Sequence, residues 1–461
     1  MKPKKSFQYI ILVIAATAGL YACHVTRPYS SNEQVAANLY REPATADSAN
    51  IATLSWNEIF KDSLLQQLIR EGIANNLNLK TAAANIKAAE ANYTQSIKAF
   101  YPSLSATGQG GLYAPADQQG NNKQLYQLYA SSSWQADIWG KLKSTKRSMY
   151  ASLLQSQAYQ QAVQTQLVAD IAGAYYTLLA YDAQLGIAQT SVEKYARDVE
   201  TMKLLKNSDV VTGAAVVQSA ANYYAVMATI PDIKNNIRQT ENTLSLLLAR
   251  TPGAIARDSI FTQQVDTSLN TGLPAQLLAN RPDVREAEFQ LRNTFELTNV
   301  ARTYFYPSVT ITGEAGLYSN NISTFFRPGA MFANLIGGIT QPIFNNGLNK
   351  QRLKVAQANY EAAQYNFQQS LLTAGQEVSN ALYQYQMASD KSLSRREQIA
   401  NLEKAVFFTS ELLKYTSNTN YTDVLTSEQN LLSARQSAVN DKLQQLQAIV
   451  NLYAALGGGW K

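Results

Sequence analysis

Histidine and cysteine, the side chains that most often carry metal sites and nucleophilic catalysis, are nearly missing from this chain of 461 residues. It contains one cysteine, Cys23, and one histidine, His24. A single cysteine cannot form an intramolecular disulfide, and a single histidine speaks against a histidine-based metal site or a catalytic triad. The sequence also shows no metal-ligand cluster and no glycine-rich phosphate loop. We therefore expect no catalytic, cofactor or metal site, and a protein that is not an enzyme.

The lone cysteine follows an N-terminal segment that has the features of a secretory signal. Lysines among the first five residues precede an apolar run at 7–22, which is too short for a comfortable transmembrane helix. The run ends Leu20-Tyr21-Ala22-Cys23, which resembles a bacterial lipobox. We interpret Cys23 as the lipidated N-terminus of the mature chain, anchored to a membrane through its acyl chains. A plain signal peptide with a stray cysteine is the alternative.

Charge is sparse in this chain and is spread along it. The net charge is +6, and charged residues make up 16% of the sequence. Because no basic block or stripe occurs beyond the extreme N-terminus, we expect no nucleic-acid partner. The remaining polarity is mostly uncharged, which suits long helices packed against neighbours or surfaces that face a water-filled lumen.

Apolar and aromatic residues between Ile171 and Met202 recur at alternating spacings of three and four. They are Ile171, Ala174, Leu178, Tyr181, Leu185, Ala188, Val192, Tyr195, Val199 and Met202. This period of 3.5 is typical of a coiled-coil seam. The surrounding segment, 142–206, contains no proline and would be about 95 Å long as a helix. The chain is therefore expected to be organised around long helical rods.

Residues 126–138 have a period of two instead. Tyr126, Leu128, Ala130, Trp134, Ala136 and Ile138 alternate with Gln127, Ser131, Ser133, Gln135 and Asp137. The alternation predicts a strand with one apolar and one polar face. Residues 103–113, rich in Gly, Ser and Thr, predict its hairpin partner, and residues 141–250 predict a long helical hairpin.

The same order of elements then occurs a second time. Phe100-Tyr101-Pro102-Ser103 is matched by Phe305-Tyr306-Pro307-Ser308, and at both places a helical pattern gives way to a strand pattern. Residues 308–318 and 331–343 predict two further strands. Residues 348–456 predict a second long helical hairpin, which the glycines at 457–459 end.

These patterns divide the chain into six segments. We expect a signal peptide at 1–22, a tether at 23–55, a first structural repeat at 56–252, a linker at 253–274, a second repeat at 275–456 and a tail at 457–461. The expected fold is mainly α with a small β part: duplicated helical hairpins plus four strands. Four strands cannot close a membrane barrel, which needs about eight or more, and open sheet edges are not viable in lipid. The strands therefore call for an oligomer in which several chains share one barrel.

The chain resembles the TolC-type outer-membrane efflux proteins, and most of all the lipoprotein branch of outer-membrane factors that serve RND-type tripartite pumps. The resemblance rests on Cys23, the two Tyr-Pro-Ser junctions, the strand end at 341–344 and the stretch 273–285 between the repeats. It covers nearly the whole mature chain. It implies a homotrimer with a twelve-stranded outer-membrane β-barrel, continued by an α-helical barrel in the periplasm.

The resemblance also implies a function and partners. The protein would be a passive exit duct for drugs or other small molecules, lipid-anchored in the cell outer membrane. It would dock to a periplasmic membrane-fusion (adaptor) protein and to an inner-membrane RND pump, or to an ABC transporter in its place. The exit duct of a type I protein secretion system is one alternative. The other is a periplasmic coiled-coil scaffold without a pore, which would have no use for the strands.

The resemblance places a gate at the ends of the helical hairpins. Asp423 matches a position where the family commonly carries an acid that narrows the pore, so three copies would form a carboxylate ring that favours cations. An ordinary first-turn acid that interacts with the helix dipole is the alternative. Tyr415 and Asn420 would complete the gate through hydrogen bonds, although a tyrosine on a helix face more often packs. The residues expected to dock the adaptor are Asn207, Gly213 and Asn418.

Overall fold

The computed structural model of this chain describes residues 25–30, 39, 41, 54–113, 123–264, 280–415 and 421–460. The chain forms two compact units. The first comprises Met1–Glu33, Ala84–Gln157 and Glu286–Gln368, and the second Gln34–Ala83, Ala158–Arg285 and Gln369–Lys461. Each unit thus contains parts of both sequence repeats, so the repeats at 56–252 and 275–456 do not fold as separate compact bodies.

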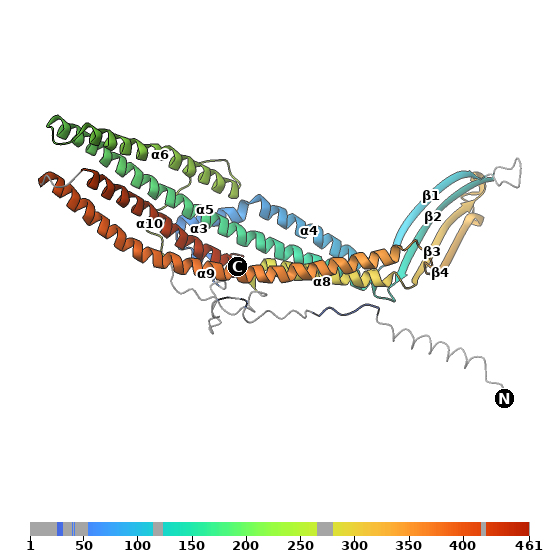
Figure 1. Ribbon diagram of the computed structural model, residues 1–461. Coiled ribbons are helices and arrows are strands. Elements are labelled where there is room, and N and C mark those ends of the chain that lie inside the picture. Colours follow the sequence, from blue (N-terminus) through green and yellow to red (C-terminus); the bar gives the residue numbers. More distant parts are fainter. Residues whose placement is uncertain are drawn as a thin grey trace. The chain divides into compact units, whose positions relative to one another are not determined.

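A four-stranded antiparallel sheet lies in the first unit (Figure 1). Its strands, in spatial order, are β1 (Ser103–Tyr113), β2 (Lys123–Ala136), β3 (Ser308–Ser319) and β4 (Met331–Thr340). The 3₁₀ turns η2 (Ile322–Thr324) and η3 (Pro328–Ala330) lie between β3 and β4. Because β2 pairs with β3, the sheet joins the two sequence repeats.

The register places most apolar residues of the four strands on one face. Leu128 is opposite Leu317 of β3, and Leu317 is in turn opposite Met331 of β4. Directly opposed residues of an antiparallel pair share a face. Gly316 is required for the approach of β2 to β3, because a Cβ there would lie 2.2 Å from the Leu128 carbonyl oxygen.

Each strand pair lies between helices. α4 (Leu77–Lys98) leads into β1, and α8 (Pro282–Thr303) leads into β3. Both helices end shortly before a Tyr-Pro pair, in keeping with the bias of a residue before proline toward extended backbone. After β2 and β4 come the 67-residue α5 (Lys141–Asn207) and the 68-residue α9 (Leu348–Tyr415), each about 100 Å long.

The second unit contains the far parts of two helical hairpins (Figure 1). α5 returns as α6 (Gly213–Leu247), and α9 returns as α10 (Tyr421–Ala455). The whole seam expected between Ile171 and Met202 faces inward, since none of its ten residues is exposed. The short helices α2 (Trp56–Ile59) and α3 (Ser63–Asn75) precede α4, and Asp62 caps α3 by accepting the Leu64 N–H. Across the described ranges, no helix combines the length and apolarity needed to cross a membrane.

Two expected strands end earlier than predicted. β2 stops at Ala136 rather than at residue 138, because the Asp137 carboxylate accepts the Leu142 and Lys143 N–H groups, both at 2.9 Å, and so begins α5. β4 stops at Thr340 rather than at residue 343, because its partner β3 begins at Ser308 and the pairing runs out there. In both strands the alternating sequence pattern therefore extends beyond the last residue that pairs with a neighbouring strand.

Candidate functional site

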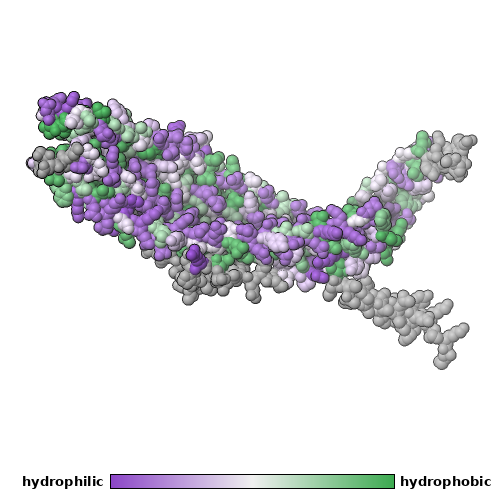
Figure 2. Space-filling model, viewed as in Figure 1, coloured by the Kyte–Doolittle hydropathy of each residue, from purple (hydrophilic) through white to green (hydrophobic). Residues whose placement is uncertain are grey.

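The sheet exposes an apolar face and two unpaired edges. Leu104 and Leu112 of β1, and Leu335 and Ile339 of β4, are each between 72% and 81% exposed. Among the residues that the structure describes, β1 pairs only with β2 and β4 only with β3, so one side of each edge strand keeps free backbone donors and acceptors. Figure 2 shows hydrophobic residues among those that cover the strands. Such a sheet needs an apolar medium against its face and further strands at its edges.

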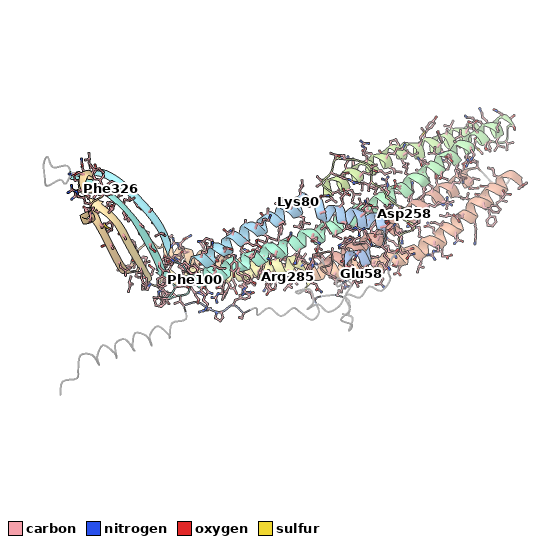
Figure 3. The ribbon with its side chains drawn as sticks, turned by 180° about the vertical axis from the view of Figure 1, so that it is seen from behind. Glu58, Lys80, Phe100, Asp258, Arg285 and Phe326 are labelled. Carbon is pink, nitrogen blue, oxygen red and sulfur yellow. The ribbon has the colours of Figure 1, made fainter. Side chains whose placement is uncertain are left out.

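Aromatic residues mark the end of the sheet where strands meet helices. Trp134 Nε1 donates to the Phe100 carbonyl oxygen at 2.9 Å, and Trp139 Nε1 donates to the Pro307 carbonyl oxygen at 2.6 Å. Trp139 also packs on Tyr306, with ring centroids 5.0 Å apart. Figure 3 shows Phe100 at this end of the sheet and Phe326 at the other. Rings that combine apolar packing with a polar contact are typical of a membrane–water interface.

The segment at residues 25–30 lies against α8, within the first unit. Asn299 Nδ2 donates to the Arg27 carbonyl oxygen at 2.9 Å, and Asn299 Oδ1 accepts the Arg27 N–H at 3.0 Å. Thr26 lies beside Gly140, where an added Cβ would be 3.3 Å from Thr26 Cγ2. Gly140 directly precedes α5. Residue 26 is therefore held at the boundary between the strands and the helices.

In the second unit, the ends of the two hairpins pack together through four buried residues, which we call the tip cluster. These are Met202 of α5 with Tyr421, Val424 and Leu425 of α10. Partly buried apolar residues cover it: Leu205, Val211, Ala215, Val216 and Leu413. The Tyr421 hydroxyl donates to the Ser219 hydroxyl of α6 at 3.1 Å. Since burial raises the pKa of Tyr421 to about 12, the hydroxyl keeps its proton at physiological pH.

Ionisable groups lie between α5 and α10 close to the tip cluster. Lys194 Nζ is 2.8 Å from Glu428 Oε1, and the Glu428 side chain is only 4% exposed. Burial, followed by the charge and hydrogen bonding of Glu428, raises the pKa of Asp198 to about 7. Burial also raises the pKa of Tyr195, with the nearby charge of Glu428 acting in the same direction. Two carboxyl groups therefore share this position with a single paired lysine.

The described residues that we predicted as gate and docking sites lie at helix ends. Asp423 is exposed in the first turn of α10, and Tyr415 is exposed as the last residue of α9. Asn207 ends α5 and Gly213 begins α6, and both are exposed. Asp423 is one residue from Val424 of the tip cluster. The remaining predicted residues, Cys23, Asn418 and Asn420, lie outside the described residues.

Sequence reasoning missed two arginines that organise the second unit, the buried Arg281 and the partly buried Arg257. Arg281 donates to Asp283, to Glu377 of α9 at 2.7 Å and to the Ala455 carbonyl oxygen at 2.8 Å. Arg257 forms ion pairs with Asp182 of α5 and Glu241 of α6. Figure 3 shows Asp258, the neighbour of Arg257, in this part of the chain. The sequence held only a weak signal for these contacts. Arg281 precedes Pro-Asp at a helix start, and Arg257 lies in the linker between the repeats.

Comparison with known proteins shows which family and which relatives this chain resembles in sequence. The profile of the family described as "Outer membrane efflux protein" matches residues 68–250 and 273–458. The toluene efflux pump outer membrane protein TtgC of Pseudomonas putida is 28% identical, over 98% of this chain and 96% of that protein. The cation efflux system protein CusC of Escherichia coli is also 28% identical, over 89% of this chain and 90% of that protein.

The fold is shared with solved channel structures. The open state of the MtrE outer membrane channel of Neisseria gonorrhoeae superposes with a TM-score of 0.84 and 24% sequence identity. The superposition covers 95% of this chain and 99% of that chain. The expected fold class, mainly helical with four antiparallel strands, is confirmed.

Proposed function

The chain belongs to the outer membrane efflux protein family, and from this premise we propose that three copies form the exit duct of a tripartite efflux system. It is an outer-membrane channel component of an efflux pump and not an enzyme. The observation that carries the proposal is the sheet with an uncovered apolar face and two unpaired edges. Twelve strands from three chains would pair every edge and turn the apolar faces toward lipid.

The cargo we propose is small molecules, moved without chemistry through an open lumen. TtgC is named for toluene and CusC for cations, which supports small solutes rather than polypeptides. The duct would receive them from an inner-membrane RND pump through a periplasmic adaptor protein, with an ABC transporter as the other possible pump. The exposed helix ends at Asn207 and Gly213, together with Asn418, are the docking residues that we propose for the adaptor.

We propose that Cys23 carries the lipid that anchors the mature chain. Thr26 follows Cys23 by three positions, and three residue steps span about 10 Å at most. Thr26 lies at Gly140, on the strand–helix boundary where the aromatic residues gather. An acyl chain on Cys23 would therefore start near the membrane surface. Mass spectrometry of the N-terminal peptide tests this, because Cys23→Ser should remove the acyl mass, whereas an unmodified mature N-terminus in the parent would contradict it.

We propose that Asp423, Tyr415 and Asn420 narrow the periplasmic opening. The exposure of Asp423 and its position next to the tip cluster support a side chain that reaches the lumen. Three carboxylates on a threefold axis would favour cations over anions. The alternative role of Asp423 is that of a first-turn acid that interacts with the helix dipole, and the conductance of an Asp423 variant distinguishes the two roles.

The test is single-channel conductance of the purified full-length protein in planar bilayers. We expect discrete current steps that prefer cations, and we expect the preference to fall in Asp423→Asn. Steps that are unchanged in the variant would keep the duct and reduce Asp423 to a helix-end residue. If trimeric, membrane-inserted protein passed no current even with Tyr421→Phe loosening the tip cluster, the duct would be rejected in favour of a scaffold.

A further inference from the structure

Asp198 of α5 and Glu428 of α10 bring two carboxyl groups together between the hairpins. Asp198 Oδ2 and Glu428 Oε2 are buried, and no donor among the described residues reaches either oxygen. A hydrogen bond between the two groups becomes available when one of them is protonated. Two ionised carboxylates within hydrogen-bonding reach of each other would repel, as in other carboxyl pairs that share a proton.

The surrounding charges do not neutralise both groups. Lys194 pairs with Glu428, and Lys194 and Arg197 lower the pKa of Asp198 less than burial and Glu428 raise it. The tyrosines at 195 and 421 remain neutral at physiological pH because their own pKa values are raised. α6 brings no charge, because it carries no ionic residue before Asp232. No charged group of α9 is among those that shift the pKa of Asp198.

The pair is positioned to act on the tip cluster. Met202 follows Asp198 by four residues on α5, and Leu425 precedes Glu428 by three residues on α10. Residues at these spacings are neighbours on a helix surface. Attraction or repulsion between the carboxyl groups therefore acts on the same two helix faces that the cluster joins.

We propose that Asp198 and Glu428 together form a proton site that holds α5 against α10 when occupied and lets the hairpin ends separate when the proton leaves. The role of this separation in opening a pore rests on the proposed function. Protonated, the pair is a carboxyl–carboxylate hydrogen bond across the interface. When the pair is deprotonated, the Asp198 carboxylate lies beside the Glu428 carboxylate without a counter-ion of its own. The closed packing of the hairpins therefore becomes less favourable as pH rises.

The experiment measures access to the tip cluster at different pH values, in the full-length protein. Met202→Cys places a thiol at a position that is 1% exposed, and Leu204→Cys places one at a position that is 67% exposed. A maleimide labels both, and the ratio of the two rates corrects for the effect of pH on the thiol itself. We expect the ratio to rise by up to about tenfold from pH 6 to pH 8, because a single proton that is released with a pKa of about 7 in the closed packing changes the opening equilibrium by that factor over this range.

Two variants test the residues. Asp198→Asn supplies an amide that donates to Glu428 permanently, so the ratio should stay low and flat across this pH range. Glu428→Gln should also remove the pH response, and it serves if the first variant folds poorly. Glu200→Gln, on the same helix at an exposed position that pairs with Lys203, is the matched control and should respond to pH as the parent does.

The outcomes separate the proton site from the duct. A flat ratio in the parent, or a pH response that survives Asp198→Asn, would overturn the proposal. Because labelling needs no current, a chain that passes no current but keeps the pH-dependent ratio would lose the proposed duct and keep the proton site. A channel that conducts but shows a flat ratio would keep the duct and lose the proton site.

Discussion

The Tyr421 hydroxyl donates a 3.1 Å hydrogen bond to the Ser219 hydroxyl, and both side chains are buried. The bond joins Tyr421, a member of the tip cluster in the first turn of α10, to α6 of the other hairpin. These residues are 202 positions apart in the sequence. If the hairpin ends separate to open a duct, this bond is among the contacts that must break.

Tyr421→Phe should make the hairpin ends separate more readily. It removes one hydrogen bond, worth about 1 kcal/mol, while keeping the buried ring. The open state should then be favoured about fivefold, which single-channel recording would show as a higher open probability. Tyr383→Phe is the matched control, because Tyr383 is an exposed tyrosine on α9 that belongs neither to the tip cluster nor to the proposed gate. Equal open probabilities in parent and Tyr421→Phe would show that the bond does not restrain opening.

A charge on the apolar face of the sheet should block membrane assembly. Leu335→Arg puts a cation at the middle of β4 on the face assigned to lipid, at a cost of about 2–4 kcal/mol near the bilayer midplane. Asn334→Arg changes the adjacent residue, which faces the other side. The yield of heat-resistant trimer in outer-membrane fractions should fall for Leu335→Arg and stay near the parent level for Asn334→Arg. The reverse order would mean that the faces are assigned wrongly.

Stability should fall with rising pH through the titration of Asp198. Its pKa in the folded chain is about 7, above the ordinary value of 3.8. Between these values the folded state holds a proton that the unfolded state releases, so the stabilisation is complete at low pH and is lost above about pH 7. The difference in melting temperature between the parent and Asp198→Asn should therefore change from pH 5 to pH 8. Parallel melting curves across that range would contradict the shifted pKa.

Local patterns were sufficient to predict the long helices and the sheet faces. The seam from Ile171 to Met202 repeats every 3.5 residues, so each turn of the helix places an apolar residue on the same face. The alternation in β2 is equally local, and the register with β3 places its apolar side chains opposite those of the partner strand. Strand ends depend on neighbours instead, which is why the role of Asp137 in starting α5 could not be read from its position in an alternating pattern.

The contacts within the candidate site could not be predicted from the sequence. Asp198 and Glu428 are 230 positions apart, and each is an ordinary helix-surface acid by its neighbours in sequence. Only the approach of α5 to α10 buries them together. Arg281 likewise stands next to a helix start, and its partner Glu377 is 96 positions away. A resemblance to a family can suggest where a gate lies, but pairings of this kind depend on side-chain geometry.

Arg281→Ala should destabilise the second unit more than the loss of a surface ion pair. The Arg281 side chain is 7% exposed and serves Asp283, Glu377 and the Ala455 carbonyl oxygen at the end of α10. Since its two carboxylate partners are partly exposed and regain water, we expect a loss of about 2–3 kcal/mol, below the full cost of breaking a buried pair. Urea unfolding of the full-length protein, followed by circular dichroism, measures this change in the free energy of unfolding.

The matched control for that experiment is Arg435→Ala. Arg435 pairs with Glu403 at 2.8 Å, and both side chains are about half exposed. Exposed pairs contribute about 0–1 kcal/mol, because water and salt screen them. Arg281→Lys adds a second comparison, since lysine keeps the charge and cannot reach three acceptors with a planar fork. If Arg281→Ala and Arg435→Ala lowered the free energy of unfolding equally, the buried contacts of Arg281 would stabilise the fold no more than an exposed ion pair does.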